Sequence, residues 1–460
     1  MVDDYYQAVG LDLFTVVCCV GLLVRFGGIR FMHPATPYIV FHVHTVTSRL
    51  LGLMNGARPL FSDYGPHLEP VVPAEIVRAA LYCDEAFWIV TAVWILLHIG
   101  VRTPSRPNAM KLDLRILRPL LLVAFVGGIA GLVLATQIPG FGPPAAFSES
   151  SAVASSSYVL ILPSWFGLAV LGYVYYRGYG RVSTILVVAY LVLMALQGSQ
   201  RFRVIIGLLL AIQIWVELHD RRWPSRTMAL VLLVSGALFF PMKTIAATIQ
   251  TGDEISLAYD ATTDSITEVS KGAALDQMFL DEFASALTLL DMQGKRYWGE
   301  IYLPLITLPI PRAIWPNKPT LAGFVYDISS RHRPMGTSGM ITTYLGEAYA
   351  NFGPYGIVIV SPILALILAL FYRAAISRPH DSVVRLAYTL VSVNLIQIYR
   401  DGLQSLVIFT FVNMMPLVVI VFAHLLVPFF TRRRLIGPAP PLMPPIRPVS
   451  TGDGSSALSQ

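Results

Sequence analysis

The chain has 460 residues, of which 55% are hydrophobic and only 13% charged, and its formal net charge is +6. In soluble domains about a quarter of the residues are charged, so this chain has too few charges to cover a soluble globule of its length. Hydrophobic stretches of about 17–25 residues, the length that a helix needs to cross a bilayer, recur along the whole sequence. Because a helix satisfies its own backbone hydrogen bonds in lipid, the composition predicts an all-α, polytopic transmembrane helical bundle.

The predicted spans divide the chain into regions. We expect about eleven spans, and they fall near residues 9–24, 37–54, 80–99, 119–137, 158–176, 182–198, 204–218, 227–247, 355–373, 386–399 and 404–429. Residues 1–249 hold the first eight of them, residues 250–340 form one large loop, and residues 341–430 hold the last three. Residues 431–460 are rich in Pro, Gly and Ser, which predicts a disordered tail.

The three cysteines show no pattern typical of a disulfide, redox or metal site. Cys18, Cys19 and Cys83 lie in or at the edge of predicted spans, with no CxxC motif and no His at metal-ligand spacing. We interpret them as small apolar residues that fill space between helices.

Lysines and arginines set the expected orientation. They recur in alternate short connections, at Arg25 and Arg30, in 102–118, 177–181, 221–226 and 373–385, and again in 432–434. With the N-terminus outside, all of these segments lie on the cytoplasmic side, as the positive-inside rule requires. The start of the chain, MVDDYY, is acidic, so no cleavable signal peptide is expected. The large loop is then extracytoplasmic, and the tail is cytoplasmic.

Residues 250–340 are far longer than the usual connection between bundled helices, which indicates a folded, functional loop. Within it, residues 273–291 predict an interfacial helix with acidic residues opposite an apolar face. That face is formed by Leu275, Phe279, Phe283, Ala286 and Leu290. Residues 299–312 are apolar but interrupted by prolines, so we expect them to lie in the headgroup layer or to dip into it.

Several cations fall on the outer side, against the positive-inside rule. They are Arg201, Arg203, Lys243, Arg312, Lys318, Arg331, Arg333 and Arg400. Because a cation at or near the membrane needs a carboxylate or a bound anion, we expect them to converge on one pocket for a phosphate or diphosphate, which suits the planar fork of arginine. The alternative is that they snorkel to lipid phosphates or pair with protein acids. The candidate acids are Asp253, Glu254, Asp281, Glu282 and Asp401.

Two residues are candidates for a general base. Glu347, in TTYLGEAYANFGPYG, lies four residues before Asn351, which puts both on one helix face. It could take a proton from a sugar hydroxyl or serve as a structural partner of the arginines. His332, between two arginines, is the second candidate, because flanking positive charge favours the neutral form that a base requires. Its alternative is an ordinary loop histidine.

No metal site is expected. His42 and His44 are two residues apart on a predicted helix, so their side chains point apart. Asp84 and Glu85 lie at the mouth of the third predicted span, and the acidic pair Asp3–Asp4 is terminal. None of these has convincing metal-ligand spacing.

Two segments of the chain carry a resemblance to a known family. They are PRAIWPNKP and GTSGMITTYLGEAYANFGPYG, with a basic, Gly-containing stretch between them. Together they resemble the Wzy-type bacterial oligosaccharide repeat-unit polymerases of O-antigen and exopolysaccharide synthesis. The segment QGSQRFR, with its outer-face arginines, is similar to that family too. The likeness in layout covers about residues 10–430, and the motifs fall within 199–203 and 309–356.

The resemblance implies a metal-independent, GT-C-like membrane glycosyltransferase without a cofactor. Its donor and acceptor would be glycans linked to undecaprenyl diphosphate, and its partners would include membrane lipid and a chain-length regulator protein, with no nucleic acid. The arginines would stabilise the diphosphate leaving group, and Glu347 or His332 would deprotonate the acceptor hydroxyl.

Two other functions stay open. A transferase like the O-antigen ligases shares the donor and the architecture but uses another acceptor. A polysaccharide flippase or other transporter would also bind an anionic lipid carrier, but it should show internal repeats and charged or broken helices at mid-membrane depth. The sequence shows no such repeat, and its charges gather on one face, which favours the polymerase.

Overall fold

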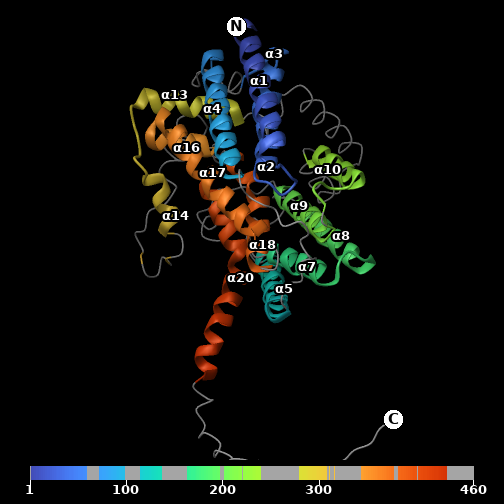
Figure 1. The fold of residues 1–460 in the computed structure, drawn as a ribbon. Helices are drawn as coiled ribbons and strands as arrows, with labels where there is room; N and C mark the ends of the chain where they lie inside the picture. The colour runs from blue at the N-terminus through green and yellow to red at the C-terminus, as the bar shows by residue number, and fades with distance from the viewer. Residues whose placement is uncertain are drawn as a thin grey trace, which may run out of the picture.

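The computed structural model describes most of the predicted spans and part of the large loop. The described residues are 2–59, 72–98, 114–136, 163–196, 201–219, 221–239, 279–307, 310, 315, 343–377, 382–400 and 402–432. Within these residues all regular structure is helical (Figure 1). This agrees with the predicted all-α class.

Each predicted span coincides with a helical segment. These segments are α1 (Val2–Phe26), the unit α2–η1–α3 (Ala35–His42, Val43–Thr47 and Ser48–Met54), α4 (Pro73–His98), α5 (Leu114–Thr136), α7 (Pro163–Arg177), α8 (Arg181–Leu196), α9 (Arg201–Leu218), α10 (Arg226–Phe239), α17 (Pro354–Ser377), α18 with α19 (Ser382–Asn394 and Ile396–Arg400), and α20 (Gly402–Arg432). The η1 segment is a π-helical turn with helical backbone on both sides.

Three of these helices are long and apolar enough to cross a membrane, namely Asp4–Phe26, Pro73–His98 and Pro354–Ser377. A fourth span would be α20, which bends by 46° between Phe411 and Asn413. The bend lies one turn before Pro416, where the missing N–H and the proline ring disturb the helix. Five further apolar helices are shorter, at 10–17 residues. The structure therefore supports a helical membrane protein, and the number of spans stays a prediction.

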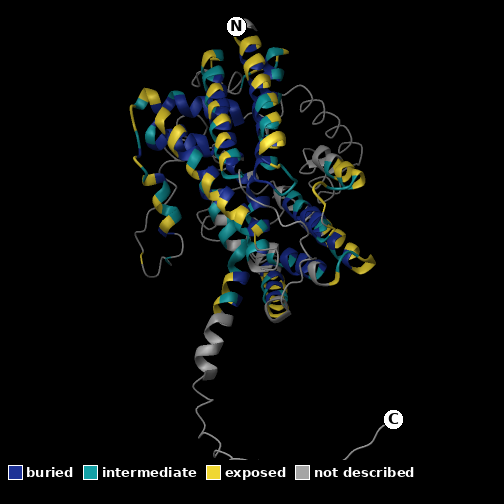
Figure 2. Ribbon diagram, viewed as in Figure 1, coloured by how far each residue is buried: buried dark blue, intermediate teal, exposed yellow. Residues whose placement is uncertain are grey.

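The outward faces of the long helices are apolar. Phe14 and Val17 on α1 and Ile363 and Ile367 on α17 are exposed, and Figure 2 shows exposed positions along α1, α4 and α17. A soluble monomer rarely exposes large continuous apolar surfaces. These faces are the ones that lipid would cover.

The buried side chains form two main clusters. The first joins α1, the α2–α3 unit, α4 and α17 with two helices outside the predicted spans, α13 (Phe279–Gln293) and α16 (Tyr344–Phe352). The second joins α5, α7, α8, α9, α18 and α20. Helix α13 crosses α4 near the end of the bundle at which α1 begins (Figure 1).

Connections that the charge pattern places on one side of the membrane do meet. The Phe31 N–H, between α1 and α2, donates to the Arg222 carbonyl between α9 and α10 at 3.0 Å. The Tyr388 hydroxyl on α18 donates to the Met32 carbonyl. These contacts place the connection after α1 beside the connection after α9 and beside the middle of α18, and the orientation in the membrane stays a prediction.

The helix predicted near residues 273–291 exists as α13, but the prediction that it lies at the membrane interface is wrong. Helix α13 begins at Phe279 and is buried on nearly every side, including Asp281 and Glu282 on the face expected to meet water or headgroups. It packs against α4 and α16. The reason is tertiary: Asp281 meets a buried arginine from α3, so its charge does not need solvent.

The proline-interrupted segment also has partners within the protein. Its described part forms the short helices η4 (Glu300–Tyr302) and α14 (Leu303–Thr307). The Gln404 side chain, near the start of α20, donates from Nε2 to the Ile301 carbonyl at 2.7 Å. Whether this segment also lies in the headgroup layer stays a prediction.

Candidate functional site

The motif segment folds into α16 and the turn after it. The Thr343 hydroxyl caps the helix by accepting from the Gly346 N–H. Gly353 ends the helix with φ +63°, a conformation that suits glycine. At Gly356 a Cβ would lie 2.0 Å from the Ala348 carbonyl oxygen, so only glycine lets α17 pack this closely against α16. The pattern GEAYANFGPYG is therefore explained in large part by backbone geometry.

Glu347 lies at the break between α19 and α20. Its side chain is buried, and Oε2 accepts a hydrogen bond of 2.8 Å from the Leu403 N–H in the first turn of α20. Gly402 has φ +83°, and a Cβ there would lie 2.1 Å from Glu347 Oε1. A carboxylate in this place satisfies a free helical N–H and interacts favourably with the helix dipole. Glu347 thus has a structural role at a helix end, and both its pairing with an arginine and its role as a base stay predictions.

Asn351 lies one turn further along α16, as its spacing predicted. Its Oδ1 accepts from the Gly299 N–H at 2.7 Å, and its Nδ2 donates to the Glu347 carbonyl at 2.9 Å. Its own carbonyl accepts from the Trp298 N–H at 3.0 Å. Trp298 has φ +48°, a rare conformation for a non-glycine residue. Asn351 therefore holds the backbone of the 298–299 turn against α16.

The predicted arginines are placed in part. Arg400 is the last residue of α19, two positions before the Gly402 that contacts Glu347. Arg201 begins α9, with Arg203 two residues later. Helices α9 and α18 run antiparallel, because Gln213 bonds Ser392 and Glu217 bonds Thr389. The start of α9 is therefore directed toward the end of α18 from which α19 continues.

The side chains of Arg201, Arg203 and Arg400 are outside the described part of the structure. Six other predicted site residues fall outside it altogether: Lys243, Arg312, Lys318, Arg331, His332 and Arg333. Their convergence on one pocket stays a prediction.

The structure contains an arginine cluster that the sequence analysis missed. Asp291 accepts from Arg78 Nη2 at 2.8 Å, from Arg296 Nη2 at 2.7 Å and from the Tyr349 hydroxyl at 2.8 Å. The Arg296 guanidinium also lies 5.2 Å from the centroid of the Tyr349 ring. We call Arg78, Asp291, Arg296 and Tyr349 the arginine cluster. Arg78 lies near the start of α4, at the end that the predicted orientation places outside. A cation on that side goes against the positive-inside rule, and this was the signal in the sequence that could have identified Arg78.

The electrostatics of the arginine cluster are those of a partly exposed cationic site. The side chains of Arg78, Arg296 and Asp291 are 40%, 22% and 33% exposed. Burial raises the pKa of Asp291, but hydrogen bonds from Tyr349, Arg296 and Arg78 outweigh it, so that the pKa lies below its ordinary value. Burial, and then the neighbouring Asp291 carboxylate, raise the pKa of Tyr349. Two guanidinium groups against one carboxylate leave a net positive charge.

A third paired arginine, Arg49, lies in the interior. Arg49 donates from Nε to Asp281 Oδ1 at 2.9 Å and from Nη2 to Oδ2 at 2.7 Å, and both side chains are fully buried. Arg49 Nη2 also donates to the Arg58 carbonyl. Asp281 was a candidate partner for the outer arginines, and this bidentate pair joins it to a residue outside that set.

A buried cluster of charged residues lies among α1, α2 and α4. His42 Nε2 is 2.9 Å from Asp12 Oδ1 and 3.4 Å from Asp84 Oδ1. Asp12 and Asp84 lie near the middles of α1 and α4. The prediction that Asp84 lies at the mouth of a span is therefore wrong, because α4 begins at Pro73, before the predicted start. An Asp at the centre of a membrane-spanning helix costs about 2.5–3.5 kcal/mol on insertion scales, and ionisable groups within such helices commonly mark functional sites.

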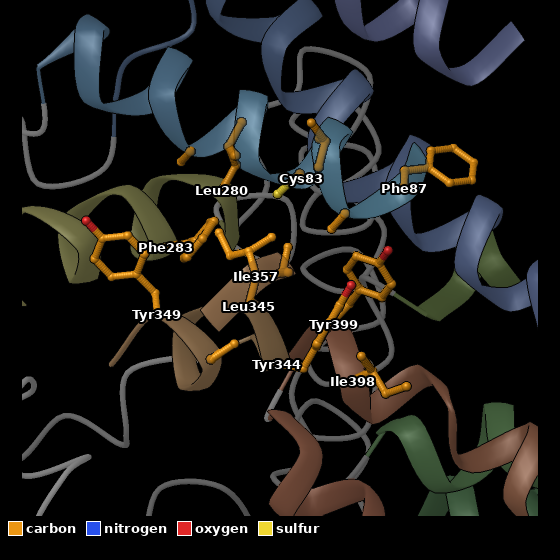
Figure 3. Close-up of a cluster of buried hydrophobic side chains, with 14 of the residues drawn as sticks. Cys83, Phe87, Leu280, Phe283, Tyr344, Leu345, Tyr349, Ile357, Ile398 and Tyr399 are labelled. Carbon is orange, nitrogen blue, oxygen red and sulfur yellow. The ribbon is translucent and has the colours of Figure 1, made fainter. Parts of the chain in front are cut away.

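Figure 3 shows a cluster of buried hydrophobic side chains around α16. Side chains such as Cys83, Phe283, Leu345 and Tyr399 converge there from four helices. The same side chains line a cavity of about 10 Å³. Because one water needs about 10–15 Å³, this cavity is too small for a sugar or a lipid. Cys83 here fills space, as predicted.

Comparisons with known proteins identify no relative. No protein-family model matches the chain, and neither a curated protein nor a solved structure matches it.

Proposed function

We propose that the chain is an inner-membrane glycosyltransferase that polymerises undecaprenyl-diphosphate-linked oligosaccharide repeat units at the periplasmic face. The observation that supports this most is the position of α16, a helix of nine residues from the motif segment. Glu347 on this helix contacts the helix break that follows Arg400, and Asn351, one turn further on, holds the 298–299 turn. Tyr349 on the same helix joins the arginine cluster. Candidate groups for proton transfer and for anion binding thus share one short, anchored helix.

The proposed reaction is a displacement at the anomeric carbon of the donor glycan. The acceptor hydroxyl oxygen forms the new glycosidic bond, the bond between that carbon and the diphosphate breaks, and the hydroxyl proton goes to a base. Negative charge grows on the diphosphate as it leaves, and arginine side chains placed beforehand stabilise that charge. The partly exposed Arg78 and Arg296 supply such donors, together with Arg201 and Arg400 from the predicted set.

The base in this proposal is Glu347, with His332 as the second candidate. The hydrogen bond from the Leu403 N–H engages Glu347 Oε2 and fixes the carboxylate on two helices at once. Fixed geometry is what proton transfer needs.

Binding of the lipid diphosphate tests the proposal directly. Purified protein in detergent should bind undecaprenyl diphosphate, measured by native mass spectrometry, and Arg296→Ala should weaken binding by about 10–100-fold, the equivalent of about 1.5–3 kcal/mol for a lost charge-assisted hydrogen bond. Arg222→Ala, in the connection after α9, is the matched control and should bind normally. Equal binding by all three proteins would remove the arginine cluster from the anion site.

Activity separates the polymerase from the related transferase. With a single lipid-linked repeat unit as both donor and acceptor, a polymerase gives a ladder of longer lipid-linked glycans. A ligase-like transferase gives no ladder and transfers glycan only when a different acceptor is added. Product length on a gel therefore decides between the two enzymes.

A transporter is the second candidate, because one observation favours it. The Asp12–His42–Asp84 cluster sits near the middle of two helices long enough to span, next to the π-helical turn η1. Charged residues at mid-membrane depth are typical of transporters. Movement of a lipid-linked glycan across vesicle membranes, without any lengthening of the glycan, would favour this reading over the polymerase.

A further inference from the structure

The Asp12–His42–Asp84 cluster has the donors of a metal site. One ligand atom from each residue lies within 4.8 Å of the others, and all three residues are buried. Two of the distances, from His42 Nε2 to the Asp12 and Asp84 carboxylates, are 2.9 and 3.4 Å. Ligand atoms about 2.0–2.2 Å from one ion in tetrahedral geometry lie roughly 3.3–3.6 Å apart. An ion among these three groups would need only small shifts of the side chains.

Several polar atoms of the cluster lack partners. Asp12 Oδ2, His42 Nδ1 and Asp84 Oδ1 have no hydrogen bond from any residue that the structure describes. Asp12 and His42 are fully buried, so water does not replace those partners at the surface. Buried polar atoms are satisfied in the great majority of cases, and exceptions point to a missing ion or water. A proton shared between His42 and Asp12 leaves other carboxylate oxygens of the cluster without a partner. A metal ion could bind those oxygens as well.

We propose that Asp12, His42 and Asp84 bind one divalent metal ion of the first transition row, for which Zn²⁺ is the best fit. One imidazole nitrogen and two carboxylate oxygens are donors that Zn²⁺ accepts in proteins. A neutral histidine and two carboxylates around a doubly charged cation make an electrically neutral group, which suits an apolar interior.

The ion would join α1, α2 and α4. These helices belong to the cluster of buried side chains that also holds α13, α16 and α17. The site is thus separate from the arginine cluster and gives the bundle a cross-link near its middle. This is a role beyond the proposed transferase chemistry, and a proposal of glycan polymerisation neither requires nor excludes it.

Metal content tests the site without any assay of activity. Full-length protein, produced with Zn²⁺ in the medium and purified in detergent, should contain close to one zinc per chain by mass spectrometry of the elements. Asp84→Asn and His42→Gln should each lower the content at least tenfold. Glu85→Gln is the matched control, because Glu85 is the exposed neighbour of Asp84 on α4 and should keep the metal.

A Co²⁺ titration covers the case in which the variants do not fold. Wild-type protein stripped with a chelator should bind Co²⁺ and show the visible absorption of a low-coordinate site, and Zn²⁺ should abolish that spectrum and raise the Tm by a few degrees. Absence of both zinc and the Co²⁺ spectrum would overturn the proposal and leave a shared proton as the group that holds the three residues together. Full zinc content in Asp84→Asn and His42→Gln would place the metal elsewhere.

Discussion

Replacement of Glu347 by glutamine separates its two possible roles. Glutamine keeps the size and one acceptor oxygen for the Leu403 N–H but loses the charge. The lost interaction with the helix dipole lowers the stability by about 0.3–1 kcal/mol, or up to about 2 in a partly buried site. Loss of a general base instead lowers turnover by about 10²–10⁴-fold, which is about 2.7–5.4 kcal/mol in the barrier. The catalytic effect is therefore the larger of the two, and both can be measured.

Gly402→Ala perturbs the same carboxylate without changing it. A Cβ at this position would lie 2.1 Å from Glu347 Oε1, and the φ of +83° is unfavourable for alanine. We expect a loss of roughly 1–2 kcal/mol in stability from the backbone conformation alone. Gly10→Ala is the control, because a Cβ there meets nothing within 4 Å and alanine favours the helix.

The assay is glycan lengthening per folded molecule, with folded protein measured by size-exclusion chromatography and thermal unfolding. If Glu347 is the base, Glu347→Gln loses turnover while it still binds the lipid diphosphate, and Gly402→Ala loses turnover as well. Normal turnover per folded molecule in Glu347→Gln would refute the base role. The residue would then have a structural role and no catalytic one, and His332 would become the candidate base.

Three further predictions concern stability and topology. Asp281→Asn should destabilise the protein by about 3–5 kcal/mol, because it leaves the buried Arg49 guanidinium without its carboxylate, and Arg49→Met with Asp281→Leu should recover most of that loss in thermal unfolding. Folding lowers the pKa of Asp291, so the stability that this carboxylate contributes is present above about pH 4, its unfolded pKa, and is lost as the pH falls toward the lower folded pKa. The fall in Tm on the acid side should therefore be smaller in Asp291→Asn than in the wild type. An identical fall in both proteins would contradict this. Reporter fusions at Asp264 and Ser450 should report opposite sides of the membrane, and the same side for both would contradict the predicted topology.

The helices could be predicted from the sequence because their signal is local. A long apolar run identifies a helix in lipid whatever lies beside it, and every predicted span has a helix in the described structure. Whether each helix crosses the membrane depends less on its own sequence and more on its neighbours. Helices α8 and α9 have 16 and 18 residues, and several others depend on packing for their place in the bundle.

The environment of α13 could not be predicted for the same reason. Its acidic residues and apolar face match an interfacial helix, and nothing near Asp281 in the sequence indicates a partner. The partner, Arg49, is 232 residues away. Ion pairs between residues far apart in the sequence decide which charged residues are buried, and hydropathy alone does not predict such pairs.

The candidate site was predictable in part. The spacing of Glu347 and Asn351 correctly placed both on α16, because helical spacing is fixed. The arginine cluster was missed because its members come from three separate segments. The Asp12–His42–Asp84 cluster was missed because each residue was judged against its neighbours in sequence, whereas metal ligands need only meet in space.

Helix α4 relates these separate features to one another. Arg78 near its start belongs to the arginine cluster, Asp84 in its middle belongs to the buried charged cluster, and Trp94 near its end donates from Nε1 to the Ala365 carbonyl of α17 at 3.1 Å. A helix held at three levels has little freedom to tilt or slide, and rigid elements position functional groups better than loops do. The position of Arg78 therefore depends on contacts that reach far into the bundle. Loss of the buried charged cluster should loosen α4 first, and the geometry of the arginine cluster at its start should change with it.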